Sequence, residues 1–308
     1  MKAGSNLEKV LQKGHFAVTA EFGPPRGADI SVIKEKAEFL KGKVDAINVT
    51  DCQTAVVRMS SIATAAILVQ MGMEPVMQMT CRDRNRIAMQ SDIFGASALG
   101  IRNMLGISGD HQSFGSQKNA KKVFDLDSIQ LIGLVKRLRD EKKMLGDEDT
   151  IQGDMPMFIG AAANPLAPPI EFRALHLKKK IDAGADFIQT QGIFDMEKFS
   201  EWMKTVRDMG LDKRCSILAG LVPLKSAGMA KYLIDNVPGI NIPESVIKRI
   251  SGVPKEKAAE EGITILCESI EQIREIKGIA GVHIMAIQWE YKIPEIAERA
   301  KLLPRPLL

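Results

Sequence analysis

The sequence predicts an α/β protein: a single closed (β/α)8 barrel, or TIM barrel, spanning residues 1–308. Short β-rich apolar runs alternate with amphipathic helical stretches, a pattern typical of parallel strands joined by helical crossovers. Eight such pairs can be counted, and eight units in 308 residues fit a closed barrel better than an open doubly wound sheet. No linker-like stretch or internal repeat divides the chain, which favours one domain.

Each expected strand is a short apolar run bounded by loop residues. The eight runs are His15–Phe22, Val44–Thr50, Pro75–Thr80, Asn103–Ser108, Met157–Ala162, Asp186–Gln191, Ser216–Val222 and Val282–Gln288.

The expected helices between and after these runs carry apolar residues at helical spacing. They are Asp29–Lys43, Ser60–Gly72, Arg84–Leu99, Asp127–Met144, Ile170–Gly184, Met196–Gly210, Ala227–Asn236 and Ile293–Leu303. Two segments depart from the regular alternation. One is a polar loop after the fourth strand, Asp110–Asp125, and the other is an extra helical block before the eighth strand, Pro243–Ile276.

The composition is that of an ordinary globular protein, with 45% hydrophobic and 26% charged residues. The net charge of +4 comes without the clustering that nucleic-acid binding requires. No window approaches the ~18 uninterrupted apolar residues of a membrane span, and the first residues lack an apolar signal core, so we expect a cytoplasmic protein. The cysteines form no CxxC pair, which fits reduced thiols better than disulfides or a zinc site. They are Cys52, Cys81, Cys215 and Cys267.

Polar residues recur on one face at the carboxyl end of five expected strands. Since the inner face of a barrel is packed and apolar except at its catalytic mouth, this pattern predicts a polar pocket there. Strands that simply become more polar as they enter loops would explain one or two cases, but not five. The pairs are Thr19 and Glu21, Asn48 and Thr50, Gln78 and Thr80, Ser108 and Asp110, and Gln189 and Gln191.

Two acids stand out at this predicted mouth. Glu21 lies in the run HFAVTAEFGPP, and a carboxyl among apolar neighbours holds its proton more tightly, which suits a general acid at neutral pH. A strand-end glutamate paired with a lysine or arginine is an equally good interpretation. Asp110 closes LGISGD, where Gly106 and Gly109 allow a ligand to approach the backbone closely. A turn or capping aspartate is the commoner role of Asp after Gly.

Other chemistries find little support. The chain has no GxSxG elbow, no HExxH motif, no phosphate loop and no GxGxxG after a strand, so barrel loops would have to hold any nucleotide. The segment EFRALHLKKKIDAG places His176 and Lys180 four residues apart on one helix face, with Lys179 beside them. Such a group can bind a phosphate, although a run of lysines on a helix is usually a solvated face.

Several segments, in their order and spacing, resemble the methylenetetrahydrofolate reductase family from about Phe16 to the C-terminus. The family consists of flavin-dependent (β/α)8 barrels that reduce 5,10-methylenetetrahydrofolate to 5-methyltetrahydrofolate. The resemblance implies an oxidoreductase of one-carbon metabolism and methionine biosynthesis, of the bacterial type that corresponds to the catalytic barrel alone. The matching segments are VTAEFGPP, NVT, MTCRD, SGD, LHLKKKIDAGADFIQTQGIFD and AGLVPL.

The resemblance also implies roles for individual residues. Glu21 matches the general acid that helps to open the five-membered ring to a reactive iminium ion. Asp110 matches the aspartate between flavin and folate, whose charge tunes the flavin and stabilises the iminium. Gln191 matches the glutamine that contacts the folate pterin. The flavin contacts implied are Thr50, Asp51, Gln78, Ser108, Gly109, Asp110, Asn164, His176, Lys179 and Lys180.

Departures from the family pattern leave some questions open. Gln78, Ser108 and the segment NPLAPPIEF differ from it around the implied flavin site, so FAD is favoured and FMN stays an alternative. Ala227 and Met285 stand where well-known bacterial members carry aromatic residues that stack on nicotinamide or folate. NADH as the direct reductant is therefore uncertain, and an electron-donating partner subunit is an alternative source.

Two other functions also stay open. One is a flavin-free, pterin-binding barrel of the methyltransferase type, and the other is a non-catalytic barrel subunit. The sequence does not fix the oligomeric state, and a homo-oligomer is compatible with it.

Overall fold

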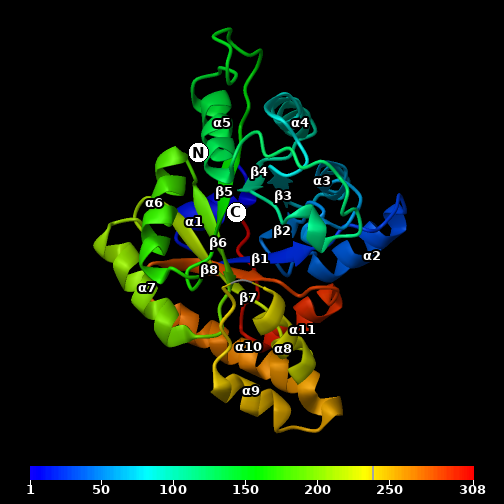
Figure 1. Cartoon of the computed structure of the whole chain (residues 1–308), viewed down its shortest axis with the longest axis vertical. Coiled ribbons are helices and arrows are strands. Elements are labelled where there is room, and N and C mark those ends of the chain that lie inside the picture. The colour runs from blue at the N-terminus through cyan, green and yellow to red at the C-terminus, as the bar shows by residue number, and fades with distance from the viewer. Residues whose placement is uncertain (238) are drawn as a thin grey trace.

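The computed structural model describes residues 1–237 and 239–308 and contains eight parallel strands that close into a barrel in chain order (Figure 1). Each strand pairs with the next, and β8 pairs with β1. The predicted (β/α)8 barrel is therefore confirmed. The strands are β1 (Ala17–Phe22), β2 (Ala46–Val49), β3 (Pro75–Thr80), β4 (Asn103–Ile107), β5 (Phe158–Ala163), β6 (Phe187–Gly192), β7 (Ser216–Leu221) and β8 (Ile279–Ile284).

The prediction for the eighth strand, Val282–Gln288, was wrong in its position. β8 starts three residues earlier and ends at Ile284. Its early part contains Gly281, where a Cβ atom would lie 2.2 Å from the Ala17 carbonyl oxygen of β1. Glycine is needed here for the close approach of the two strands, whereas in sequence it is easily read as part of a loop.

The expected helices are present, and side-chain caps fix several of their starts. Asp29, Ser60, Asn85 and Asp127 each accept a hydrogen bond from a backbone N–H of the first turn. These helices are α2 (Ile30–Leu40), α3 (Ser61–Gln70), α4 (Arg86–Ala98), α5 (Ser128–Asp140), α6 (Arg173–Ala183), α7 (Met196–Asp208), α8 (Ala227–Asn236) and α11 (Ile293–Arg299).

The extra helical block before β8 is confirmed as α9 (Glu244–Ser251) and α10 (Ala258–Glu275), which lie next to α8 at one end of the view in Figure 1. Short 3-10 turns lie in the loops. They are η1 (Gln53–Ala55), η2 (Gln112–Phe114), η3 (Ile170–Phe172), η4 (Lys255–Lys257) and η5 (Glu290–Lys292). Among residues 1–237 and 239–308, no helix is long and apolar enough to cross a membrane.

A further helix that the sequence analysis did not predict, α1 (Asn6–Gln12), closes the amino-terminal end of the barrel. Leu7 and Val10 are fully buried against inward-facing side chains of the strands, including Phe158 and Phe187. The Glu8 carboxylate accepts backbone N–H groups from the residues just before the helix, at 2.9 Å from Ala3 and 2.8 Å from Gly4. The barrel interior is therefore apolar and sealed at this end.

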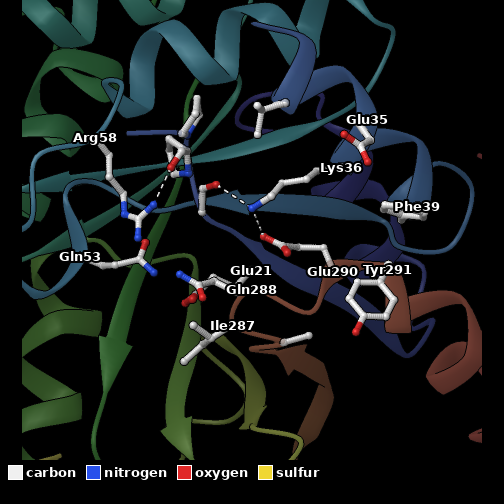
Figure 2. Close-up of a pocket in the computed structure, with 15 residues that line it drawn as sticks. Glu21, Glu35, Lys36, Phe39, Gln53, Arg58, Ile287, Gln288, Glu290 and Tyr291 are labelled. Atoms are coloured by element: carbon white, nitrogen blue, oxygen red, sulfur yellow. Dashed lines mark hydrogen bonds and ion pairs between the residues drawn. The ribbon is translucent and has the colours of Figure 1, made fainter. Parts of the chain in front are cut away.

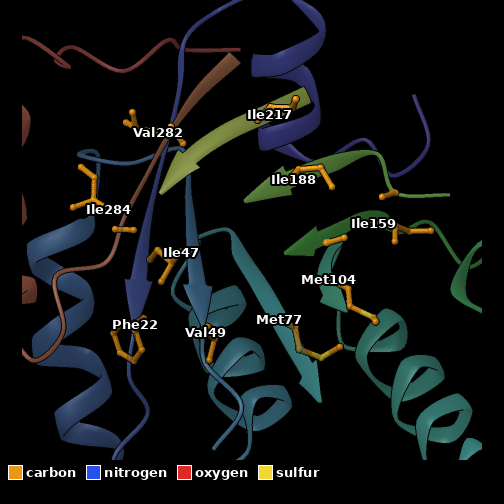
Figure 3. Packing of buried hydrophobic residues seen from close by; sticks show 14 of the residues in the cluster. Phe22, Ile47, Val49, Met77, Met104, Ile159, Ile188, Ile217, Val282 and Ile284 are labelled. Atoms are coloured by element: carbon orange, nitrogen blue, oxygen red, sulfur yellow. The ribbon is translucent and has the colours of Figure 1, made fainter. Parts of the chain in front are cut away.

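The main hydrophobic core lies outside the barrel, between the strands and the surrounding helices. Figure 3 shows side chains from all eight strands that belong to this core. Because the outward positions hold this core, the inward positions near the carboxyl ends are free to carry polar groups. The labelled core residues are Phe22, Ile47, Val49, Met77, Met104, Ile159, Ile188, Ile217, Val282 and Ile284.

Candidate active site

A cavity of about 510 Å³ opens at the carboxyl ends of the strands. Side chains from β1, β2, β3 and β6 line it, as the alternation of polar residues predicts, so a polar mouth is present. The lining consists of Glu21, Asn48, Thr50, Asp51, Gln53, Gln78, Thr80, Arg82, Leu105, Ile107, Ser108, Gly109, Asp110, Ala162, Ala163, Asn164, Arg173, His176, Lys180, Gln189, Thr190, Gln191, His283 and Met285.

The face assignment for the fourth strand was wrong. Leu105 belongs to the core inside the barrel and Met104 to the core outside it, so the inward positions of β4 are odd-numbered. Ser108 and Asp110 still reach the mouth because β4 ends at Ile107 and the chain then turns at Gly109, where φ is +86°. A period of two holds only while the chain stays a strand.

A buried polar layer forms the floor of the cavity. The Thr19 hydroxyl lies 2.9 Å from His283 Nδ1 and accepts a hydrogen bond from Gln189 Nε2 at 3.2 Å. Burial lowers the pKa of His283 to about 3, so its ring is neutral at physiological pH. His283 was not among the site residues predicted from the sequence. It lies on the inward face of β8, two residues before Met285, and the predicted run Val282–Gln288 already contained it, so the strand period could have found it.

Amide atoms of two side chains on this floor lack protein partners. Asn48 Nδ2 and Oδ1 and Gln189 Oε1 are buried without a hydrogen bond, and both side chains line the cavity. Buried polar atoms nearly always have partners, so a bound polar molecule or water must satisfy them. Unpartnered amide donors and acceptors in one cavity suit the edge of a heteroaromatic ring.

Glu21 lies near the carboxyl end of β1, half-buried, on the wall of the cavity. Burial raises the pKa of its carboxyl to about 7; the nearby charge of Glu290 adds to the rise and that of Arg58 opposes it. This acid is therefore protonated in a large fraction of molecules at neutral pH. The sequence alone left it equally open that Glu21 forms a simple ion pair.

Asp110 lies exposed at the rim, where its Oδ2 accepts the backbone N–H of Thr54 at 2.8 Å. The loop that donates this bond is unusual, because Cys52, Thr54 and Ala55 all have positive φ. A β-branched residue in that region is rare and costs free energy. Asp110 is thus at the mouth as predicted, and η1 is held against it.

One side of the mouth is cationic. Lys180 is buried, and its Nζ donates a hydrogen bond to the Ala162 carbonyl oxygen at 2.6 Å. Burial lowers the pKa of Lys180 to about 8; the charge of Asp127 opposes this change and that of Arg173 adds to it. His176 also lines the cavity, and its pKa is lowered by burial and then by Lys180. Arg173, which the sequence analysis missed, lines it too. Lys179 is exposed and is not part of the lining, because consecutive helical residues point about 100° apart.

Most other residues of the implied site also reach the cavity, but Asp51 serves the protein itself. Its Oδ2 accepts from the Thr80 backbone N–H and hydroxyl, both at 2.9 Å, and from Arg84 at 2.7 Å. The lining residues that were predicted are Thr50, Gln78, Ser108, Gly109, Asn164 and Gln191.

Ala227 and Met285 are brought together by the structure. Ala227 begins α8 and Met285 follows β8, and both pack against the same small apolar cluster at the α8–α9 side of the barrel. Met285 also lines the cavity. Met285 therefore gives this side of the mouth an aliphatic surface, whereas Ala227 packs against the same cluster without lining the cavity.

The closed barrel, with an acid and a cationic edge at its polar mouth, is the architecture of a (β/α)8-barrel enzyme. The chain belongs to the methylenetetrahydrofolate reductase family, whose model matches residues 6–301.

Named relatives agree with this membership. A probable methylenetetrahydrofolate reductase (NADPH) of Caenorhabditis elegans is 23% identical over 304 residues, which cover 94% of this chain and 43% of that protein. The 5,10-methylenetetrahydrofolate reductase of Salmonella typhimurium is 24% identical over 79% of this chain and 76% of its own length. Methylenetetrahydrofolate reductase 2 of Saccharomyces cerevisiae is 26% identical over a stretch that covers 79% of this chain and 39% of that protein. The chain thus spans less than half the length of the eukaryotic relatives it matches.

Among solved structures, an uncharacterised protein from Clostridium thermocellum that binds two copies of 5-methyl-5,6,7,8-tetrahydrofolic acid has a TM-score of 0.62. The match covers 97% of this chain and 100% of that one, at 12% sequence identity. At this identity the similarity shows a shared fold.

Proposed function

We propose that this chain reduces 5,10-methylenetetrahydrofolate to 5-methyltetrahydrofolate by hydride transfer from a reduced flavin, with Glu21 as general acid and Asp110 as electrostatic stabiliser. Membership of the reductase family supports the reaction. The observation that carries the proposal is Glu21 itself, an acid whose pKa is raised to about 7 on the wall of a polar cavity. A general acid works best when its pKa lies near the working pH.

The residues of the mouth fit a flavin. The unpartnered amide of Asn48 and the free Oε1 of Gln189 offer a donor and acceptors to the edge of a heteroaromatic ring. Arg173 and Lys180 offer cations to a phosphate, and His176 offers a hydrogen bond. When bound there, the flavin would supply the hydride. Other proposed flavin contacts are Thr50, Gln78, Ser108, Gly109, Asp110 and Asn164. FAD is favoured over FMN, and chromatography of the cofactor released by heat distinguishes the two.

Three side chains of the cavity have separate proposed roles in the reaction. The Glu21 carboxyl donates its proton to the ring nitrogen that leaves the methylene bridge, which opens the five-membered ring. The Asp110 carboxylate, fixed by the Thr54 N–H, stabilises the positive charge that develops on the iminium. Gln191 is the proposed pterin contact, and its Oε1 already accepts the Gly192 N–H at 3.0 Å, which orients the amide.

An absorption spectrum of the purified chain separates this proposal from its competitors. Flavin bands near ~375 and ~450 nm, as expected for flavins in general, support the reductase. A pterin-binding methyltransferase barrel would show folate binding without these bands. A non-catalytic subunit would show neither turnover nor folate-dependent changes.

Replacing Glu21→Gln tests the assigned acid. The amide cannot donate the proton, so we expect turnover of methylenetetrahydrofolate to fall by about 10²–10⁴-fold, while flavin content and flavin reduction by an artificial donor stay normal. Glu35→Gln, an exposed acid of α2, is the matched control and should keep full activity. Folate turnover of the Glu21 variant within a few-fold of the unmodified chain would show that Glu21 is not the acid.

A further inference from the structure

A second cavity, of about 360 Å³, reaches Glu21 from the other side (Figure 2). It lies between the loop that follows β1 and the segment between β8 and α11. Glu21 and Gln53 line both this cavity and the central one. The carboxyl of Glu21 is thus reached by two routes, one of which does not pass through the proposed substrate cavity.

A partly buried ion pair lies on the wall of this second cavity. Lys36 of α2 and Glu290 of η5 approach to 2.8 Å, and their side chains are 26% and 6% exposed. Lys36 Nζ also lies 3.4 Å from the Gly23 carbonyl oxygen and 5.7 Å from the centre of the Phe22 ring. Figure 2 shows the pair beside Glu21, with the Lys36 contacts dashed. The Glu290 carboxylate is therefore fixed on the wall of the cavity that Glu21 also lines, where its charge acts on Glu21.

We propose that Lys36 and Glu290 are a positioning pair that keeps the Glu21 carboxyl protonated between turnovers from this second cavity. The inference rests on the proposed role of Glu21 as general acid. A fixed carboxylate disfavours a second negative charge nearby, so it holds the proton on Glu21. Lys36 determines where that charge lies and partly compensates it.

The second cavity also gives Glu21 a source of protons. In each turnover the O–H bond of the carboxyl breaks as its proton passes to the substrate nitrogen, which leaves a carboxylate. A new O–H bond then forms with a proton from water. When substrate fills the central cavity, the second cavity is the side on which water still meets Glu21.

Other charged groups also face Glu21, and they do not reproduce this arrangement. Arg58 lies in the same cavity and opposes the effect of Glu290. Glu35 is exposed, so water screens it. The groups across the central cavity are Asp51, Arg82, Asp110, Arg173, His176, Lys180 and His283.

Two substitutions at the pair should shift the Glu21 pKa in opposite directions. Glu290→Gln removes the anion and leaves the Lys36 cation, so the Glu21 pKa should fall by about one unit. Lys36→Met leaves the Glu290 charge uncompensated, so the Glu21 pKa should rise by a similar amount. At pH 8 the first change lowers the protonated fraction of Glu21 by about tenfold. Glu35→Gln is the matched control in the same cavity and should leave the pKa unchanged.

The measurement is a pH titration by ¹³C NMR of protein labelled at the glutamate carboxyl carbon, with the Glu21 signal assigned by its loss in Glu21→Gln. No substrate is needed, so the result does not depend on whether the proposed reaction occurs. Glu290→Asp, which restores an anion, should return the Glu21 pKa toward its original value. If the pair only joins the first and last units of the barrel, both variants lower the melting temperature and leave the Glu21 titration in place, and that result overturns the proposal.

Discussion

Glu21 binds its proton more tightly in the folded chain than in the unfolded chain, because burial and the charge of Glu290 penalise its ionised form. Its folded pKa of about 7 lies above the value of 4.5 for a free carboxyl. The stability that comes from the neutral carboxyl is therefore complete below pH 4.5 and is lost as the pH rises through 7.

This linkage predicts the pH dependence of stability for Glu21→Gln. Near pH 4.5 the variant and the unmodified chain should differ little, and above pH 7 the variant should be more stable by about 1–3 kcal/mol, because it buries no charge. Denaturant unfolding at a series of pH values measures the difference. The control Glu35→Gln should give a difference that does not change across this range, and the same flat result for Glu21→Gln would contradict the raised pKa.

Asp110 offers a second test at the scale of a single residue. In Asp110→Asn the side-chain oxygen can still accept the Thr54 N–H, so the loop should keep its shape while the negative charge is lost. Reduced, anionic flavin then becomes easier to form, and we expect the midpoint potential to rise by about 30 mV, or ~1.4 kcal/mol for two electrons. Folate affinity should weaken about tenfold.

Redox titration and folate binding, measured on the same preparation, check both parts of this prediction. Asp149→Asn, an exposed aspartate in the segment after α5, serves as the control for loss of one negative charge. If neither the potential nor the affinity of Asp110→Asn differs from this control, Asp110 lies outside the site.

The site residues that the sequence predicted were those on a local pattern. Glu21 and Gln191 follow the strand period, and His176 and Lys180 follow the helix period. Glu290 gives no such pattern. Its proposed role depends on a contact with Lys36, 254 residues away in the chain, and only the closed barrel creates that contact.

Among the elements, the predictions for β4 and β8 were wrong. In β4 the alternation of faces was continued beyond the end of the strand, and in β8 a glycine interrupted the apolar pattern. β4 ends at Ile107, so counting on to Asp110 gave the wrong face, although a turn at Gly109 brings the aspartate back to the mouth. The start of β8 was missed because of Gly281. The number and order of the strands were predictable because eight short apolar runs, buried on both faces, alternate with amphipathic helical stretches.

The helix α1 is an element whose role in stability can be tested directly. Leu7 is fully buried inside the amino-terminal end of the barrel, so Leu7→Ala should destabilise the fold by about 2–5 kcal/mol. Flavin content at low temperature should stay normal, because the polar mouth lies at the opposite end of the strands. Leu11→Ala, at a half-buried position of the same helix, should cost clearly less. Urea unfolding compares the two variants, and equal losses would mean that α1 does not seal the barrel.

At the scale of the whole molecule, the barrel is sealed at one end and polar at the other. A ligand of the central cavity therefore enters at the carboxyl-terminal mouth, and an electron donor would reach the proposed flavin there as well. Met285 lines this mouth with aliphatic surface and Ala227 packs against the same apolar cluster, so neither position offers an aromatic ring to a nicotinamide. An aromatic stacking contact is worth about 0.5–1.5 kcal/mol beyond the area that it buries, so two lost contacts can weaken nicotinamide binding by tenfold or more.

We therefore predict that NADH reduces the flavin of the isolated chain slowly and that a partner subunit supplies the electrons. Stopped-flow mixing of the oxidised chain with NADH, without oxygen, measures the rate from bleaching near ~450 nm. The double variant Ala227→Phe/Met285→Phe should increase the affinity for NADH if stacking is what is missing, because each ring restores one contact at the mouth. Rapid bleaching of the unmodified chain at micromolar NADH would rule out the need for a partner. Slow bleaching that a copurifying subunit accelerates would identify the donor, since the mouth is the route by which electrons can reach the flavin.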